Sequence, residues 1–173
     1  MTSRYVWRDG ELGFEQDAPR GAHLLYLPTV RDPTGSLTPF EWSALPFEPK
    51  RVFLLTDLVQ GSRRGGHAHH ELQELIVAAS GAFTVKTLDE RGWHAWTLNR
   101  PDQALFVPPG VWRVLGDFSG NAIALVLAST PYDPSDYIRD MAEFQAQLPA
   151  RNPADNWFAN ERWKEVEEWR KGA

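Results

Sequence analysis

The chain contains no cysteine, which excludes disulfide bonds, a thiolate nucleophile and a zinc–thiolate site. It has no long basic run and a formal net charge of -5 at pH 7, which argues against a general nucleic-acid-binding function. No apolar run approaches the length that crosses a membrane, and the N-terminal segment lacks the apolar core of a signal peptide. We therefore expect a cytoplasmic protein that binds neither nucleic acid nor membranes.

What the chain has in abundance is short apolar or alternating runs separated by turn residues. Its 173 residues suffice for one domain with a sizeable core. Many short strands at this spacing indicate an all-β antiparallel sandwich or barrel over 22–132. We expect 1–21 to be an N-terminal arm and 133–173 a helical extension, with one helix over 136–148 and a Trp-rich helix over 156–171. The clearest predicted strands are 23–27, 51–55, 75–79, 82–88, 104–107 and 122–127.

The stretch from Arg64 to Glu74 contains two histidines at positions i and i+2, within a run that reads as a β-strand. Successive strand residues point to opposite faces, so His67 and His69 point the same way. Two imidazoles on one face of a sheet make either a proton-handling pair or half of a metal site.

The spacing around this pair resembles the first conserved motif of the cupin superfamily. Gly61, His67, His69, Glu74 and Gly81 fill its positions. The turn 108–110 supplies part of the second motif, but Arg113 stands where metal-binding cupins carry a third histidine. The resemblance implies a cupin jelly-roll barrel.

A closer resemblance is to the nucleotide-sugar 3,4-ketoisomerases, also found as WxcM-like domains, which act on dTDP-4-keto-6-deoxyglucose. It extends over about residues 22–145. It implies a cofactor-independent isomerase of deoxysugar biosynthesis that moves a carbonyl from C4 to C3 of a dTDP-sugar. It also implies a homodimer whose N-terminal segment contributes to the interface. The matching segments are 32–37, 51–53, 57, 64–69, 108–113, 117–119, 127–129, 132–133 and 136–139.

By this resemblance His67 and His69 are the catalytic acid–base residues, because imidazole titrates near neutrality. We expect His69 to be the base at C3 and His67 to shuttle protons. Guanidinium suits a diphosphate, so Arg51 and Arg64 are the first candidates for substrate binding, with Arg113 and Arg139 weaker ones. Trp112 could stack on the thymine ring.

Two alternatives stay open. His67, His69 and Glu74 are three of the four ligands of a metal-dependent cupin and could hold a divalent transition metal. Against that, the permanent charge of Arg113 would repel the cation, and Arg113 can instead pair with Glu74. The second alternative is a non-catalytic sugar-nucleotide-binding cupin, because Leu54 and Thr56 stand in a strand where the family usually has tyrosines.

Overall fold

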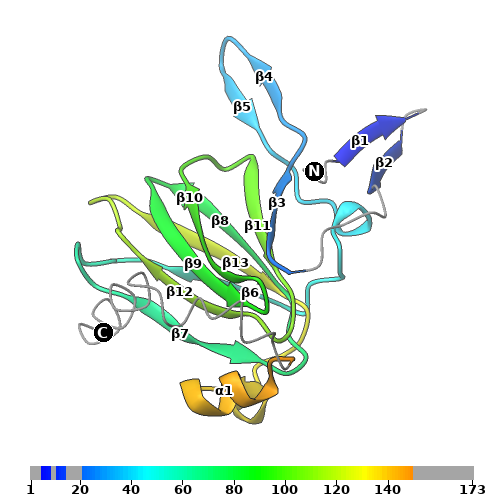
Figure 1. Ribbon diagram of the computed structural model, residues 1–173. Coiled ribbons are helices and arrows are strands. Elements are labelled where there is room, and N and C mark those ends of the chain that lie inside the picture. The colour runs from blue at the N-terminus through cyan, green and yellow to red at the C-terminus, as the bar shows by residue number, and fades with distance from the viewer. Residues whose placement is uncertain (1–4, 9–10, 15–20, 150–173) are drawn as a thin grey trace.

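The computed structural model describes residues 5–8, 11–14 and 21–149. Within these ranges the chain is mostly β-structure, with two five-stranded antiparallel sheets, two small hairpins and one short α-helix (Figure 1). This confirms the antiparallel β architecture that the sequence predicts. No helix in these ranges combines the length and the apolar character needed to cross a bilayer.

Each sheet mixes strands from distant parts of the sequence. In order across the first sheet, the strands are β10 (Gly92–Leu98), β9 (Phe83–Asp89), β12 (Trp112–Gly116), β7 (Arg64–His69) and β14 (Tyr137–Ile138). In order across the second, they are β3 (His23–Tyr26), β11 (Gln103–Val107), β8 (Glu74–Ser80), β13 (Ile123–Ala128) and β6 (Arg51–Leu55). The strands predicted from the alternating runs are therefore confirmed.

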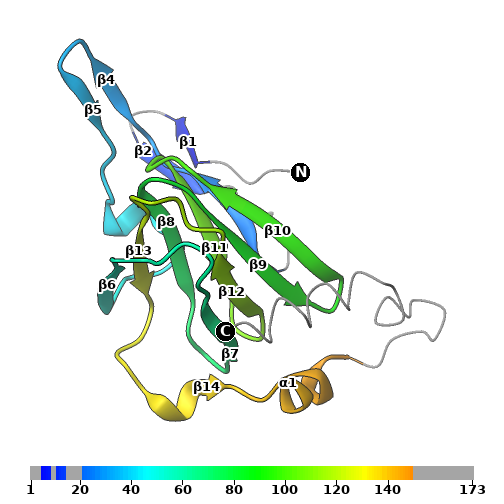
Figure 2. The ribbon, with the colours of Figure 1, turned by 90° about the vertical axis from the view of Figure 1, so that its left-hand side faces the viewer.

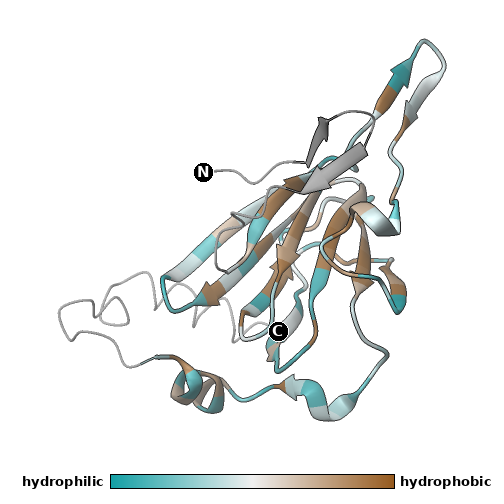
Figure 3. Ribbon diagram, turned by 90° about the vertical axis from the view of Figure 1, so that its right-hand side faces the viewer, coloured by the Kyte–Doolittle hydropathy of each residue, from teal (hydrophilic) through white to brown (hydrophobic). Residues whose placement is uncertain are grey.

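The main hydrophobic core lies between the two sheets and draws on both. It includes Val85 and Leu115 from the first sheet and Ile76, Leu105 and Val126 from the second, all at most 5% exposed. Hydrophobic residues are concentrated on the strands (Figure 3). Because alternate residues of a strand face opposite sides, each strand has one set of side chains in this interior and one set on an outer face.

The outer face of the first sheet has its own apolar cover. The helix α1 (Met141–Gln147) places Met141 and Phe144 against Leu88, Trp112 and Ile138. Both views show α1 and β14 at one end of the sheets, while the hairpin of β4 (Val30–Asp32) and β5 (Gly35–Leu37) projects at the other end (Figures 1 and 2). The second hairpin pairs β1 (Tyr5–Arg8) with β2 (Glu11–Phe14).

The helix expected over 136–148 begins later than predicted. A short 3₁₀ turn over Pro134–Asp136 is capped by Asp133, and Tyr137 and Ile138 then pair with β7 as strand β14. The α-helix starts only at Met141, where the Asp140 side chain accepts a hydrogen bond from the Glu143 amide at 2.9 Å. The ladder with β7 thus overrides the local helix signal. The Trp-rich helix expected over 156–171 lies outside the described residues, and the boundaries at 21 and 132 stay predictions.

Candidate active site

The two histidines of β7 face the space between the sheets, as their spacing predicts. Their rings meet edge to face, with centroids 5.0 Å apart and an interplanar angle of 87°. His69 is buried, with only 3% of its side chain exposed, and His67 is half-buried. The neighbouring strand β12 sets Arg113 opposite His67, so the guanidinium enters the same space.

An ion pair between Arg113 and Glu74 joins the two sheets next to the histidines. Arg113 Nη2 lies 2.8 Å from Glu74 Oε2, and the two side chains are 3% and 8% exposed. Arg113 Nη1 also donates to the carbonyl oxygen of His67 at 3.1 Å. Arg113 therefore holds the backbone of β7 from the inside.

This ion pair bears on the metal-dependent alternative. The Glu74 carboxylate is matched to the permanent positive charge of Arg113. Over the described ranges, no group of three or more His, Asp or Glu side chains is arranged to hold a metal ion. The described residues therefore give no support to the ligand set His67, His69 and Glu74, and the metal-dependent alternative stays a prediction.

Arg51 reaches the same space from the second sheet. Its partner across the ladder is Ala128, whose other neighbour is Glu74. The Arg51 guanidinium carbon lies 5.2 Å from the Phe53 ring centroid and 5.5 Å from that of Tyr132. Such cation–π contacts orient a guanidinium while leaving its N–H donors free for an anion. Arg51 is thus brought to the site, as predicted.

Arg64 is placed differently. It is exposed at the start of β7, three residues before His67, and therefore about 10 Å away along the strand. It can meet a ligand only if that ligand extends well beyond the histidines. A nucleotide diphosphate sugar is long enough to do so.

The structure adds Tyr137, for which sequence reasoning found no role, and places Arg139, a weaker candidate for substrate binding, beside it. Tyr137 of β14 pairs with His69, and its ring centroid lies 4.2 Å from that of His69 and 4.8 Å from that of His67. The Arg139 guanidinium carbon lies 4.1 Å from the Tyr137 ring centroid. The segment 136–139, which is part of the family resemblance, is the signal in the sequence that points to these residues. The helix expected over 136–148 hides it, because a helix would not place them beside β7.

Asp136 is the other addition to the site. Its Oδ2 lies 2.9 Å from His69 Nδ1, and its side chain is 13% exposed. The contact is at ion-pair distance without the alignment of a hydrogen bond. Catalytic contacts often tighten only when the substrate is bound.

Both imidazoles are held neutral. Burial, followed by the charge of Arg113, lowers the pKa of His67 to about 2 and that of His69 to about 3. For His69 a hydrogen bond to the Asp136 backbone opposes this lowering of the pKa, and the charge of Arg51 adds to it. A neutral imidazole can accept a proton, whereas an imidazolium cannot. At neutral pH both His67 and His69 are therefore in the form that can act as a base.

Buried nitrogens in this space lack partners. Within the described ranges, the buried nitrogens of this space that have no hydrogen-bond partner are Arg51 Nε, His67 Nδ1, both ring nitrogens of His69 and Arg113 Nη2; of these, His69 Nδ1 and Arg113 Nη2 each lie at ion-pair distance from a carboxylate. Buried polar atoms are normally hydrogen-bonded, so unpartnered ones gathered at one place point to a polar ligand.

Trp112 is a core residue on the outer face of the first sheet, and its contact with a nucleotide base stays a prediction. It is 3% exposed, and its ring packs 5.4 Å from Phe144 of α1 on the outer face of the first sheet. The physical reason is the period of the strand. Arg113 points between the sheets, so its neighbour Trp112 must point away from them.

The same alternation places the missing tyrosines outside the histidine site. On β6, Arg51, Phe53 and Leu55 are half-buried on the inner side, whereas Leu54 is 56% exposed on the outer side. Thr56 is exposed beyond the end of the strand. The departure from the family at these two positions therefore leaves the surroundings of the two histidines intact.

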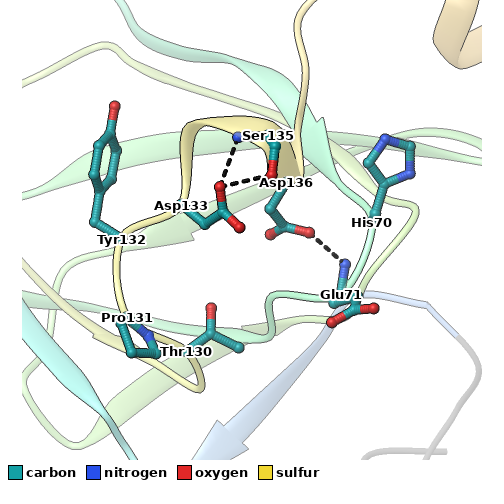
Figure 4. A pocket seen from close by; sticks show the side chains of 8 residues that line it. All are labelled: His70, Glu71, Thr130, Pro131, Tyr132, Asp133, Ser135 and Asp136. Atoms are coloured by element: carbon teal, nitrogen blue, oxygen red, sulfur yellow. Dashed lines mark hydrogen bonds between the residues drawn. The ribbon is translucent and has the colours of Figure 1, made fainter.

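An open cavity of about 520 Å³ adjoins the site on the side of Asp136. Residues that follow β7 and β13 line it, and the Asp133 carboxylate turns back to the amide and hydroxyl of Ser135 (Figure 4). Its volume lies in the range of small-molecule pockets. The lining residues are His70, Glu71, Thr130, Pro131, Tyr132, Asp133, Ser135 and Asp136.

Paired neutral imidazoles, a phenol and two arginines in a double-sheet β-fold define an acid–base site for an anionic substrate. Comparison with known proteins shows the family to which the chain belongs. The family described as FdtA, WxcM-like, C-terminal matches residues 20–148. The TDP-4-oxo-6-deoxy-alpha-D-glucose-3,4-oxoisomerase of Aneurinibacillus thermoaerophilus is 36% identical over 124 residues, or 71% of this chain and 89% of that protein.

Solved structures agree with this assignment. The sugar 3,4-ketoisomerase QdtA from Thermoanaerobacterium thermosaccharolyticum, in complex with TDP, matches with a TM-score of 0.72 at 31% identity, over 75% of this chain and 95% of its own. The TDP-quinovose 3,4-ketoisomerase WlaRB from Campylobacter jejuni matches with a TM-score of 0.71 at 36% identity, over 75% and 100%. The chain belongs to the WxcM-like FdtA family, which confirms the predicted resemblance.

Proposed function

We propose that this protein is a TDP-sugar 3,4-ketoisomerase that converts TDP-4-keto-6-deoxyglucose into a 3-keto-6-deoxyhexose. The observation that carries the proposal is the pair of neutral imidazoles His67 and His69, in ring contact with each other and with Tyr137. A His-to-Asn variant of QdtA has been solved with TDP-4-keto-6-deoxyglucose. The fold and family of the present chain support the same substrate class.

The reaction moves two hydrogens within one molecule. Nε2 of His69 removes the C3 proton, the electrons of that C–H bond form the C3=C4 double bond, and the C4 oxygen takes the negative charge. A proton then passes from the C3 oxygen to the C4 oxygen, a step that we assign to His67. The C3 carbonyl then forms as the double-bond electrons take up, at C4, the proton that His69 carries, which returns His69 to its neutral form. This is general acid–base work, which contributes about 10²- to 10⁴-fold to such rates.

No net oxidation occurs in this sequence of steps, and we propose that it needs neither a redox cofactor nor a metal ion. Stabilisation of the charge on the C4 oxygen can come from nearby donors. Tyr137 is held against both histidines, and its phenol is one such donor.

The diphosphate is assigned to arginines. Arg51 is oriented by Phe53 and Tyr132 and has a buried Nε without a partner among the described residues. Arg139 lies beside Tyr137, and Arg64 is exposed farther along β7. Guanidinium groups bind phosphate oxygens in a bidentate way, so these three are the proposed contacts. Arg113 is occupied with Glu74 and keeps a structural role.

We also propose that the two sheets close as a cupin barrel and that the protein is a homodimer. Support for the dimer comes from large apolar side chains left exposed on β6 and on the projecting hairpin, which include Val52, Leu54, Val30 and Leu37, each at least 50% exposed. Analytical ultracentrifugation tests this: a species of twice the chain mass is expected, and a monomer at micromolar concentration contradicts it.

The activity is tested by proton NMR of TDP-4-keto-6-deoxyglucose incubated with the purified protein in D₂O and EDTA. The expected result is new 3-keto sugar signals together with deuterium in the ring. An unchanged sugar spectrum contradicts the proposed function. Turnover that disappears with EDTA and returns with a divalent metal contradicts the proposed independence from metal.

A further inference from the structure

Asp136 accepts hydrogen bonds from several backbone amides of the turn that follows β7, next to the active site. Its Oδ1 accepts the amide N–H of Glu71 at 2.8 Å, and its Oδ2 accepts the amide N–H of Leu72 at 3.2 Å. Its own carbonyl accepts the amide N–H of His70 at 3.0 Å. Three consecutive amides of the turn after β7 are thus bound by one residue, which fixes the carboxylate in place.

That fixed carboxylate lies at one nitrogen of one histidine. Oδ2 is 2.9 Å from Nδ1 of His69, although this contact lacks the alignment of a hydrogen bond, whereas His67 forms no ion pair with a carboxylate in the described part of the chain. The ladder explains the placement: Tyr137 pairs with His69, so the residue just before it sits at the end of β7. The two imidazoles therefore differ in their surroundings although they share a strand.

We propose that Asp136 is a positioning residue that holds His69 in the Nδ1–H tautomer and so makes Nε2 the proton-accepting nitrogen. An ionised carboxylate can only accept hydrogen bonds, so the nitrogen that faces it must carry the proton. Nε2 then keeps its lone pair. Neither ring nitrogen makes an aligned hydrogen bond within the described residues, and Nδ1 is the one that lies 2.9 Å from the Asp136 carboxylate. The inference rests on the proposed function and explains why His69, rather than His67, is the base at C3.

The arrangement also stabilises the product of the first step. When Nε2 takes the C3 proton, His69 becomes an imidazolium with both nitrogens protonated, and Asp136 faces the new charge. A carboxylate in this position stabilises the cation without taking the proton itself. Among the described residues His67 has no carboxylate partner, and it is suited to passing a proton on, not to keeping one.

The chain offers a matched control in Asp133. This residue lies on the same short turn and lines the same cavity (Figure 4), and its carboxylate also accepts a backbone amide hydrogen bond. Within the described residues its carboxylate accepts hydrogen bonds from the amide and hydroxyl of Ser135, so it is bound to its own turn rather than to a histidine. Asp133→Asn therefore repeats the chemical change of Asp136→Asn without touching His69.

The test combines ¹⁵N NMR of the histidine side chains with kinetics of the full chain. In the unsubstituted protein we expect His69 to show a protonated Nδ1 and an unprotonated Nε2. In Asp136→Asn we expect the two tautomers to mix and kcat to fall by about 10²-fold or more, with KM within about threefold of its original value. In Asp133→Asn the tautomer of His69 should be the same as in the unsubstituted protein.

A protonated Nε2 on His69 in the unsubstituted protein overturns the proposal, even if Asp136→Asn fails to fold. Retention of both the tautomer and kcat in a folded Asp136→Asn variant also overturns it. Failure of the proposed function is a separate result: the unsubstituted protein would not turn over the sugar, while the tautomer of His69 would still report on Asp136.

Discussion

Replacing Glu74 by leucine removes the carboxylate that neutralises Arg113 between the sheets. The Arg113 guanidinium would stay where it is, because its Nη1 also bonds the carbonyl of His67. It would then be a charge at 3% exposure with its ion-pair partner gone. Burying an unpaired charge is among the most costly changes in a protein interior.

The magnitude follows from the burial of both partners. At 2.8 Å and 3% and 8% exposure, this pair is of the buried kind, for which loss of one partner costs about 3–5 kcal/mol of unfolding free energy. Replacing both partners by apolar residues of similar size removes the unpaired charge. We therefore expect Glu74→Leu/Arg113→Met to recover most of the loss, less about 2 kcal/mol for the lost bond to His67.

The assay is urea unfolding of the two single variants and the double variant, read as a double-mutant cycle. Glu71→Leu, an exposed glutamate at the nearby turn, is the control and should change stability by less than about 0.5 kcal/mol. A loss of less than about 1 kcal/mol for Glu74→Leu would refute the reasoning. So would a double variant no more stable than the worse single variant.

Other predictions follow from the same geometry. Because the pKa values of His67 and His69 are lowered to about 2 and 3 in the fold, the unfolded chain binds more protons below pH 6.5. The contribution of the two rings to the free energy of unfolding should be fully present above pH 6.5 and fall below it by up to about 1.4 kcal/mol per pH unit for each ring. Urea unfolding at pH 7.5 and 5.5 measures this fall. An equally steep fall in the His67→Asn/His69→Asn variant speaks against the prediction. Trp112→Ala should cost about 3–5 kcal/mol of stability with little change in KM, since the ring packs on Phe144; a raised KM at unchanged stability would return it to the ligand site. Arg64→Ala should raise KM with kcat nearly constant, and a reduced kcat at constant KM would place Arg64 in the chemistry.

The strands and the histidine pair could be predicted because both depend on short-range alternation. A period of two residues sets His67 and His69 on one face whatever the rest of the fold does. The Arg113–Glu74 pairing could also be anticipated from charge alone, since a permanent cation beside a carboxylate in a core must find it.

What could not be predicted depends on which distant strands become neighbours. Asp136 and Tyr137 reach the site only because β14 pairs with β7, across more than sixty positions of sequence. Read locally, the same segment carries helix signals. The orientation of Trp112 could not be predicted for a related reason. The sequence does not say which face of β12 points between the sheets, and the structure shows this through the ion pair of Arg113 with Glu74.

The central claim is that the two imidazoles of β7 carry the proton transfers. It is tested most directly by turnover of TDP-4-keto-6-deoxyglucose, with deuterium entry from D₂O, in His67→Asn and His69→Asn. The control is His70→Asn, because His70 follows His69 in the chain and is exposed. We predict kcat losses of about 10²- to 10⁴-fold in the first two, unchanged thermal stability near neutral pH, and near-original activity in His70→Asn. Near-original turnover in both His67→Asn and His69→Asn would contradict the mechanism.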